Sequence, residues 1–382
     1  MRSSTVLVRG KQNGAARGAR IGDVAREAGV STATVSRALA HPAQVSKELR
    51  ERVGAAVAKL GYTPNAAARQ LRVKRSRTVL VVTRRRWSAP FFAEVLRGLD
   101  AELSAAGYAM VLANFDGDGG NRSRQLVDMM FSGTIEGAVM LSGIVVAAEG
   151  RTMLDAGLPL VSLCAAAEGT HTVLTNEAEC IVEGARRLAV LGHTDFLYLA
   201  GPPSNYNERV RWAALSAFFA DPRQAGLRLR RAESGDFSTD GGLSAAQAFL
   251  GLSPRPTAVI ASADEIAIGF MKAVRAAGIG VPSDVSVLGF DGIEFADFCE
   301  PVLSTIRQPR EALGRLGARV LIEAIEAPSL PPLSHHVLPS RLDFRASTGP
   351  APPGGASRGR EAAPAPKRKG ARAPVPAPAE GR

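Results

Sequence analysis

A chain of 382 residues, 46% of them hydrophobic, is too long for one average domain and can fill two or three cores. The formal net charge is +11, and the positive charge lies at the two ends of the chain. Residues 20–77 hold twelve basic and four acidic side chains, residues 346–382 hold seven and two, and residues 78–345 carry a net −6. A mildly acidic body joined to a basic module indicates a separate unit that binds a polyanion.

Cysteine spacing and hydropathy exclude several classes of protein. Cys164, Cys180 and Cys299 are far apart and lack metal-ligand spacing, which fits buried thiols in a reducing cytosol better than a disulfide framework. No apolar run approaches the length of a membrane span, and no continuous apolar stretch precedes Arg9 as in a secretory signal. We therefore expect a cytoplasmic protein with no membrane partner.

The two ends of the chain are predicted to be disordered. Residues 1–19 are rich in Gly, Arg and Ser, and residues 346–382 are rich in Pro, Ala and Arg. Such segments cannot bury enough apolar surface to fold. The tail from 346 is either an additional nonspecific DNA contact or a solvated extension, and the general behaviour of charge runs favours the extension.

Residues 20–63 are predicted to form three short helices. In IGDVAREAGVSTATVSRAL, residues 21–39, Gly29 supplies a turn and Ser31 caps a second helix that begins near Thr32. A third helix follows Ser46. The positions predicted to face a shared core are Ile21, Val24, Ala25, Ala28, Val30, Val35, Ala38, Leu39, Leu49, Val53, Val57 and Leu60.

Two helices joined by a glycine-containing turn are typical of a helix-turn-helix, whose second helix enters the major groove of DNA. Thr32 and Ala33 then meet base edges and thymine methyl groups at the start of that helix, and Arg37 can bond a guanine edge. The phosphate contacts are assigned to Ser31, Thr34 and Ser36. An ordinary pair of packed helices is the alternative, and the local positive charge favours DNA.

Residues 64–77 are predicted to form a linker with a short helix. Pro64 ends one element, Asn65 can cap the next, and the sequence AAARQL precedes a basic stretch.

Residues 78–345 alternate short apolar runs with amphipathic helices, such as those at 91–107 and 265–278. This alternation predicts parallel α/β sheets, and its length favours two lobes with a ligand cleft beyond the carboxyl ends of the strands. The predicted strands are 79–82, 109–115, 137–141, 158–163, 196–201, 257–262 and 285–290.

The succession DVAREAGVSTATVSRAL, GYTPNAAARQLR, PFFAEVLRGLDAELSAAGY, PTAVIASADEIAIGFMKAVRAAGI and VPSDVSVLGFDGIEFADF resembles the lactose-repressor (LacI/GalR) family of bacterial regulators, up to about residue 345. VSTATVSRAL and GDFS are most similar to its cytidine-responsive branch. The resemblance implies an all-α helix-turn-helix head and an α/β two-lobed, periplasmic-binding-protein-like body with parallel sheets flanked by helices.

The family resemblance assigns further residues to DNA. Residues 65–72 would form a hinge helix that contacts the minor groove through Asn65, Ala68, Leu71 and Arg72. Leu71 would be the apolar wedge, and partial unstacking of bases costs a few kcal/mol that added contacts offset. The alternative for Leu71 is packing against the same helix of a dimer partner, and both can hold.

The resemblance also implies an effector site at Phe91, Phe92, Arg211, Asp264 and Asp291. Charged groups such as Arg211 and Asp291 make strong hydrogen bonds to polyols, and a salt bridge between the lobes is the alternative for this pair.

Three positions depart from the family pattern. Ala263 stands where an Asn is usual, Cys164 stands where an Asp is usual, and the first strand runs into TRRRWSAPFF, residues 83–92. A site that loses two polar ligands and gains Trp87 indicates an effector that is less hydroxylated or more anionic than a hexose, such as a phosphorylated sugar, a nucleoside or a sugar acid. The arginines at 84–86 fit a solvated loop better than an anion site.

The sequence therefore predicts a homodimeric transcriptional regulator, most simply a repressor, whose affinity for double-stranded operator DNA is controlled by a sugar, sugar derivative or nucleoside. A transport-type solute-binding protein and an activator or dual regulator are the alternatives. No nucleophile elbow, P-loop, dinucleotide motif or metal spacing is present, so we expect no enzyme activity and no cofactor or metal. His193 is predicted to cap a helix C-terminus.

Overall fold

A computed structural model describes residues 19–62, 75–84, 89–115 and 120–353. The chain divides into a head, within residues 1–76, and a body, within residues 77–382, and each is described by itself.

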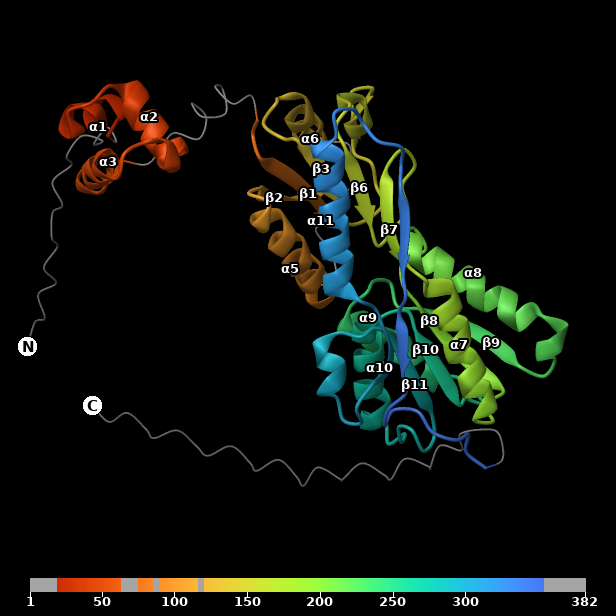
Figure 1. Cartoon of the computed structure of the whole chain (residues 1–382). Coiled ribbons are helices and arrows are strands. Elements are labelled where there is room, and N and C mark those ends of the chain that lie inside the picture. Colours follow the sequence, from red (N-terminus) through yellow and green to blue (C-terminus); the bar gives the residue numbers. More distant parts are fainter. Residues whose placement is uncertain (1–18, 63–74, 85–88, 116–119, 354–382) are drawn as a thin grey trace, which may run out of the picture. The chain divides into compact units, whose positions relative to one another are not determined.

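Three helices form the head, as predicted: α1 (Ile21–Ala28), α2 (Thr32–Ala40) and α3 (Lys47–Leu60), with a 3-10 turn η1 (Pro42–Gln44) before the third (Figure 1). Gly29 ends α1 with a φ of +63°, a left-handed conformation that glycine adopts without strain. The Ser31 hydroxyl then accepts from the Thr34 amide over 3.1 Å and starts α2.

The head core contains most of the predicted side chains. Buried Val24, Val35 and Val53 join the three helices. Leu39 was predicted to face this core, and that prediction is wrong because 37% of the residue is exposed. Its neighbour Ala38 faces the core, and successive residues on a helix point about 100° apart.

Two six-stranded sheets organise the body (Figure 1). The sheet of the first lobe is entirely parallel, in the order β13 (His335–Leu338), β7 (His171–Thr175), β6 (Leu160–Leu163), β3 (Gly137–Met140), β1 (Thr78–Arg84) and β2 (Ala109–Phe115). The sheet of the second lobe has the order β14 (Arg341–Asp343), β12 (Ser304–Arg307), β11 (Ser286–Asp291), β10 (Ala258–Ala261), β8 (Asp195–Ala200) and β9 (Arg228–Glu233), with only β14 antiparallel.

Helices cover both faces of each sheet, which confirms the predicted α/β class. The first lobe carries α5 (Ala89–Ala105), α6 (Asn121–Phe131) and α11 (Arg310–Glu326), and the second carries α7 (Glu177–Val190), α8 (Tyr206–Ala220), α9 (Thr239–Leu250) and α10 (Asp264–Ala276). The small elements are β4 (Ala147–Ala148), β5 (Arg151–Thr152), η2 (Met153–Ala156), η3 (Pro222–Gln224) and η4 (Glu294–Asp297).

The chain crosses between the lobes three times: after β7, after β12 and after β13 (Figure 1). Hydrogen bonds join the three crossovers to one another. The Thr175 hydroxyl donates to Oε1 of Gln308 over 2.8 Å, and the Ser340 amide donates to Oδ1 of Asn176 over 2.8 Å. The three crossover segments are therefore hydrogen-bonded to one another and form a single hinge between the lobes.

The folded body extends beyond the predicted boundary at residue 345. Ser347 is buried, and its hydroxyl donates to the Val287 carbonyl over 2.6 Å. The Gly349 amide donates to the Ser286 hydroxyl over 3.0 Å, and the Ala351 amide donates to the Leu191 carbonyl over 2.9 Å. Residues 346–351 were predicted to belong to a disordered tail, but their backbone and side-chain polar groups satisfy buried partners in the second lobe.

Candidate DNA-reading helix and effector cleft

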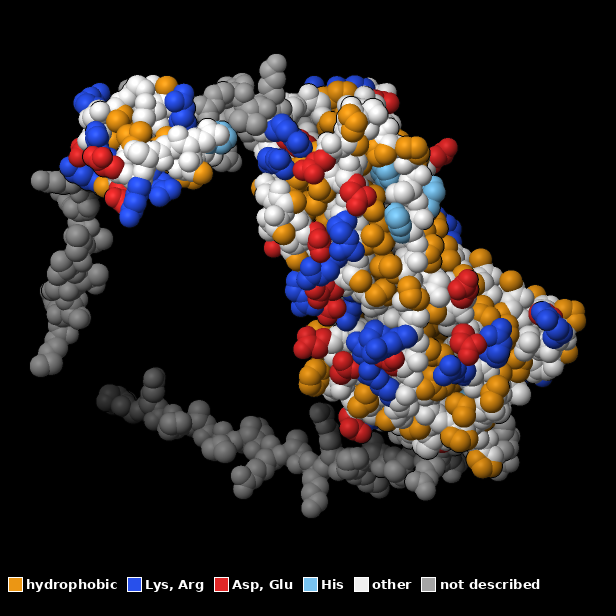
Figure 2. All heavy atoms as spheres, viewed as in Figure 1, with side chains coloured by type: hydrophobic (Ala, Val, Ile, Leu, Met, Phe, Trp, Pro, Cys, Tyr) orange, Lys and Arg blue, Asp and Glu red, His pale blue; other side chains and the backbone are white. Residues whose placement is uncertain are grey.

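Helix α2 exposes all three residues predicted to read bases. Thr32, Ala33 and Arg37 are exposed, whereas Val35 and Ala38 are buried against α1 and α3. Lys and Arg side chains are spread over the visible face of the head (Figure 2). The helix can therefore present its outer side to a groove while its inner side holds the head together. The pairing of each residue with a base stays a prediction.

Of the residues assigned to phosphate, Ser31 and Thr34 lie at the start of α2, and Ser36 lies in its middle. Ser31 is exposed, and its hydroxyl oxygen lies 2.8 Å from that of Thr34. Thr34 and Ser36 are half-buried. The positive end of a helix dipole favours an anion at this point. The hinge residues Asn65, Ala68, Leu71 and Arg72 lie outside the described residues.

A cleft of about 80 Å³ lies in the body, and side chains from both lobes line it. It brings together four of the five predicted effector residues: Phe91 and Phe92 from α5, Arg211 from α8, and Asp291 at the end of β11. The rings of Phe91 and Phe92 meet edge to face, with centroids 4.9 Å apart. Aromatic rings from one lobe and charged groups from the other thus line the same cleft. The remaining lining residues are Thr83, Arg84, Leu141, Ser142, Ala165, Asn205, Asn207, Phe237 and Gln308.

Arg211 is buried, and partners within the second lobe hold it. Its Nε donates to Oε2 of Glu177 over 2.9 Å, and its Nη2 donates to Oε1 of Glu177 over 3.1 Å. Nη1 donates to the Ser262 carbonyl, and Nη2 lies 3.6 Å from Oδ1 of Asp291. The guanidinium also lies over the ring of Phe290, with Cζ 3.8 Å from the centroid. These ion pairs lie within the second lobe, so the alternative of a salt bridge between the lobes is wrong.

Asp291 points toward the cleft from a strained backbone. Its φ is +112°, which non-glycine residues rarely adopt, and such strain is concentrated at functional sites. Oδ1 accepts from Nε2 of Gln308 over 2.8 Å. Burial raises the pKa of Asp291, and the neighbouring Arg211 opposes that rise.

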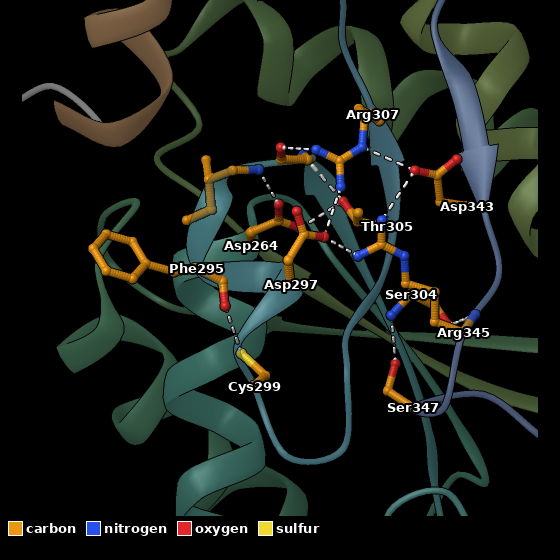
Figure 3. Close-up of polar contacts among 12 residues, drawn as sticks. Asp264, Phe295, Asp297, Cys299, Ser304, Thr305, Arg307, Asp343, Arg345 and Ser347 are labelled. Carbon is orange, nitrogen blue, oxygen red and sulfur yellow. Dashed lines mark hydrogen bonds and ion pairs between the residues drawn. The ribbon is translucent and has the colours of Figure 1, made fainter.

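Asp264 does not line the cleft, and its prediction as an effector ligand is wrong. The side chain is fully buried at the start of α10. Its two oxygens accept from the Thr305 hydroxyl over 2.7 Å and from the Ile293 amide over 2.8 Å (Figure 3). A Cβ on Gly289 would lie 2.2 Å from Oδ1 of Asp264, so that strand position excludes a side chain. The carboxylate therefore fixes the turn that follows Asp291.

Two of the three departures from the family pattern, Cys164 and Ala263, lie beside the cleft rather than in its lining. Cys164 is buried with a φ of +65°, and burial, together with the charges of Glu177 and Asp291, raises the pKa of its thiol. It lines a neighbouring pocket of about 220 Å³. Ala263 is buried and precedes α10 without a side-chain cap. Of the loop that was expected to compensate, Arg84 lines the cleft, and residues 85–88 lie outside the described part.

Sequence reasoning missed Glu177, Asn205, Asn207 and Gln308. Asn205 caps α8, its Oδ1 accepting from the amides of Asn207 and Glu208, and an Asn at the start of a helical pattern is a recognisable signal. Glu177 has no such signal, because its pairing with Arg211 joins α7 and α8 across 34 positions of sequence.

His193 caps the C-terminus of α7 through its backbone, as predicted, since its amide donates to the Leu188 carbonyl over 3.3 Å, but its side chain has a further role. The ring is buried, with Nδ1 2.9 Å from the Thr257 hydroxyl and Nε2 3.0 Å from the Gly349 carbonyl. Burial lowers the pKa of this imidazole. His193 therefore holds the end of the folded body against the second sheet.

Within the described residues, no group of three or more His, Cys, Asp or Glu side chains is placed to hold a metal ion. Among the described helices, none combines the length and the apolar character needed to span a bilayer.

Comparison with known proteins gives matches for both units. The family described as "Bacterial regulatory proteins, lacI family" matches residues 20–65, and the description "Periplasmic binding protein-like domain" matches residues 185–348. The ribose operon repressor of Escherichia coli (strain K12) is 32% identical over 314 residues, which are 81% of this chain and 93% of that protein. The HTH-type transcriptional repressor CytR of the same organism is 31% identical over 318 residues, covering 80% and 89%.

The fold is similar to that of the Lac repressor dimer bound to operator and the anti-inducer ONPF. The TM-score is 0.75 at 26% identity, and the match covers 87% of this chain and 100% of that one.

Proposed function

This chain belongs to the lacI family of bacterial regulatory proteins, and we propose that it represses transcription under the control of a small molecule bound in its cleft. The observation that carries the proposal is the cleft itself. Aromatic and charged side chains from two lobes converge there, in a chain that also carries a helix-turn-helix head. Because its target is operator DNA, the protein acts in the cytoplasm.

DNA recognition is assigned to α2 and to the linker. Thr32, Ala33 and Arg37 read bases in the major groove, and Arg37 has the reach and donors for a guanine edge. Ser31, Thr34 and Ser36 contact phosphate, and Asn65, Ala68, Leu71 and Arg72 contact the minor groove.

The effector is a sugar, a sugar derivative or a nucleoside. Phe91 and Phe92 offer an apolar wall for a ring, and Arg211 and Asp291 offer charged hydrogen-bonding groups for its hydroxyls. The ribose operon repressor is among the relatives, so ribose is the first compound to test.

A ligand that touches both lobes changes the balance between lobe arrangements, because it binds one arrangement more tightly than the other. The three bonded crossovers are the segments that such a movement must bend. Operator binding must then change effector affinity by the same factor as effector changes operator affinity.

We assign homodimerisation to an apolar groove of about 890 Å³ beside α10 and η4. Phe295 and Phe298 on its rim are 61% and 78% exposed, which is unusual for large apolar side chains. Arg307 and Arg345 both bond Asp297 in η4, so the segment that carries these rings is fixed before any partner arrives (Figure 3). The partner that covers this surface is a second copy of the chain, because a two-fold dimer matches the symmetry of a pseudo-palindromic operator.

Selection of binding sites from a random DNA library, followed by anisotropy titration with and without ligands, tests the whole assignment. We expect a pseudo-palindromic site and a change in its affinity with at least one sugar or nucleoside.

Asp291→Asn tests the cleft, and Asp128→Asn, which changes an exposed residue of the first lobe, is the matched control. Thermal unfolding should show stabilisation of the wild type and the control by that ligand, with a much smaller effect in Asp291→Asn. A ligand at about 100 times its Kd adds about 2.7 kcal/mol, a shift that is readily measured. Equal stabilisation of all three proteins would remove the cleft from the proposal.

A further inference from the structure

The guanidinium of Arg211 has no bidentate edge available to a ligand. The Nε–Nη2 edge is paired with both oxygens of Glu177. At the other edge, Nη1 donates to the Ser262 carbonyl and Nη2 faces Oδ1 of Asp291 at 3.6 Å. Arginine binds carboxylate and phosphate best through two parallel bonds along one edge, and protein groups occupy both edges here.

The charges around Arg211 also disfavour an anionic ligand. One guanidinium is set against the carboxyl groups of Glu177 and Asp291, all buried. With Asp291 ionised the cluster has a net charge of −1, and with Asp291 protonated it has none. In neither state does it offer net positive charge to an anion, and charge effects are strong where water is excluded. Carboxyl and amide oxygens, in contrast, accept hydrogen bonds from neutral hydroxyl groups.

Glu177 exerts this effect without touching the ligand. It is absent from the lining of the cleft and instead lines the neighbouring pocket, on the far side of Arg211. Its position as the first residue of α7 also lets the positive end of the helix dipole stabilise the carboxylate. It is therefore a positioning residue, which acts on the cleft through its two hydrogen bonds to Arg211 and through its charge.

We infer that Glu177 makes the cleft selective for an uncharged, hydroxyl-bearing effector, because its carboxylate offsets the charge of Arg211 and leaves no net positive charge for a phosphorylated or acidic counterpart. The inference rests on the proposed function and narrows its ligand class. The expectation based on Ala263 and Cys164 was an effector either less hydroxylated or more anionic than a hexose, and the inference rejects the anionic alternative. Arg84 is the other described cation of the lining, and it is half-buried. Titration of the wild type with neutral and anionic ligands therefore measures the effect of Arg84 together with that of Glu177.

The first test needs no knowledge of the effector. Glu177→Gln keeps the shape of the side chain and removes its charge, and Glu183→Gln makes the same change on an exposed turn of α7, where the carboxylate pairs with Arg186 and Arg187. Inorganic phosphate is titrated against thermal unfolding at constant ionic strength. We expect it to raise the Tm of Glu177→Gln by about 2 °C or more beyond its effect on the wild type and on Glu183→Gln. The same response in all three proteins would overturn the role of Glu177.

The second test uses the wild type, so it stands even if Glu177→Gln fails to fold. Calorimetric titration compares ribose with ribose 5-phosphate, glucose with gluconate, and cytidine with its monophosphate. Within any pair that binds, we expect the neutral member to bind more tightly by about tenfold or more, the scale of a charge-assisted hydrogen bond. Equal or tighter binding of an anionic member would overturn the inference and leave the effector cleft intact. Failure of every neutral and anionic member to bind would count against the cleft and therefore against both proposals.

Discussion

Gln308 bonds the cleft carboxylate of Asp291 and the hinge at the same time. Its Nε2 donates to Oδ1 of Asp291 over 2.8 Å, and its Oε1 accepts from the Thr175 hydroxyl over 2.8 Å. Gln308 and Thr175 belong to different crossovers between the lobes. A ligand hydroxyl that donates a hydrogen bond to Asp291 therefore acts on a group already bonded to the segment that must bend.

Replacement of Gln308 should weaken the coupling between effector and operator more than it weakens effector binding. Gln308→Met keeps the volume of this buried side chain and removes both bonds. Coupling free energies are typically 1–3 kcal/mol, so we expect the ratio of operator affinities with and without effector to shrink by about 5-fold or more. Anisotropy titration measures that ratio, with Gln247→Met on the exposed side of α9 as control. An unchanged ratio would remove Gln308 from the mechanism.

Arg37→Ala should reduce operator affinity by about 1–3 kcal/mol and relax specificity at one base pair, while binding to random DNA changes little. Arg26→Ala removes an equivalent charge from exposed α1 and serves as control. Competition gel shifts with single-base operator variants give the measurement. Equal losses for the two variants would show that Arg37 contributes charge but no base reading.

Phe298→Glu should produce monomers, because it places a charge on an apolar surface that is 78% exposed in the single chain. The matched control is Phe131→Glu, which changes a 43% exposed ring at the end of α6. Analytical ultracentrifugation should find the wild type and the control as dimers. A dimeric Phe298→Glu protein would place the contact between subunits elsewhere.

Asp264 should make the protein less stable as pH rises. Burial raises the pKa of this carboxyl to about 7, whereas an unfolded chain gives about 3.9. The folded state therefore binds more protons than the unfolded state between these values, and the free energy of unfolding falls as pH rises through them. Urea unfolding at pH 5 and pH 8 should show a smaller fall in Asp264→Asn than in the wild type. A similar fall in both would mean that other groups cause the pH dependence.

The fold class was readable from the sequence because its central strands are apolar runs. VLVV, GAVML and TAVIAS predict buried strands at the positions of β1, β3 and β10. The edge strand β2 was also predicted, whereas the internal strands β7 and β12 and the edge strands β9, β13 and β14 escaped this signal. β9 contains RLRRAE, and β13 and β14 are short and partly exposed, so their pairing depends on neighbours distant in sequence rather than on their own composition.

The cleft was only partly predictable. Phe91, Arg211 and Asp291 follow from family motifs, and the structure brings them together. Asp264 follows from the same kind of motif, yet its oxygens are bonded inside the second lobe. Glu177 carries no local signal, because the identity of a buried ion-pair partner is set by helix packing.

The segment from β13 to Ala351 has a consequence for synthesis of the protein. It gives the first lobe its edge strand β13, gives the second lobe β14, and then supplies Ser347 and Gly349 to the buried groups around His193. During translation both lobes must therefore wait for the same late segment, although their other strands emerge far earlier. Until that segment has been made, both sheets are incomplete. The unpaired edges of β7 and β12 then need protection from aggregation.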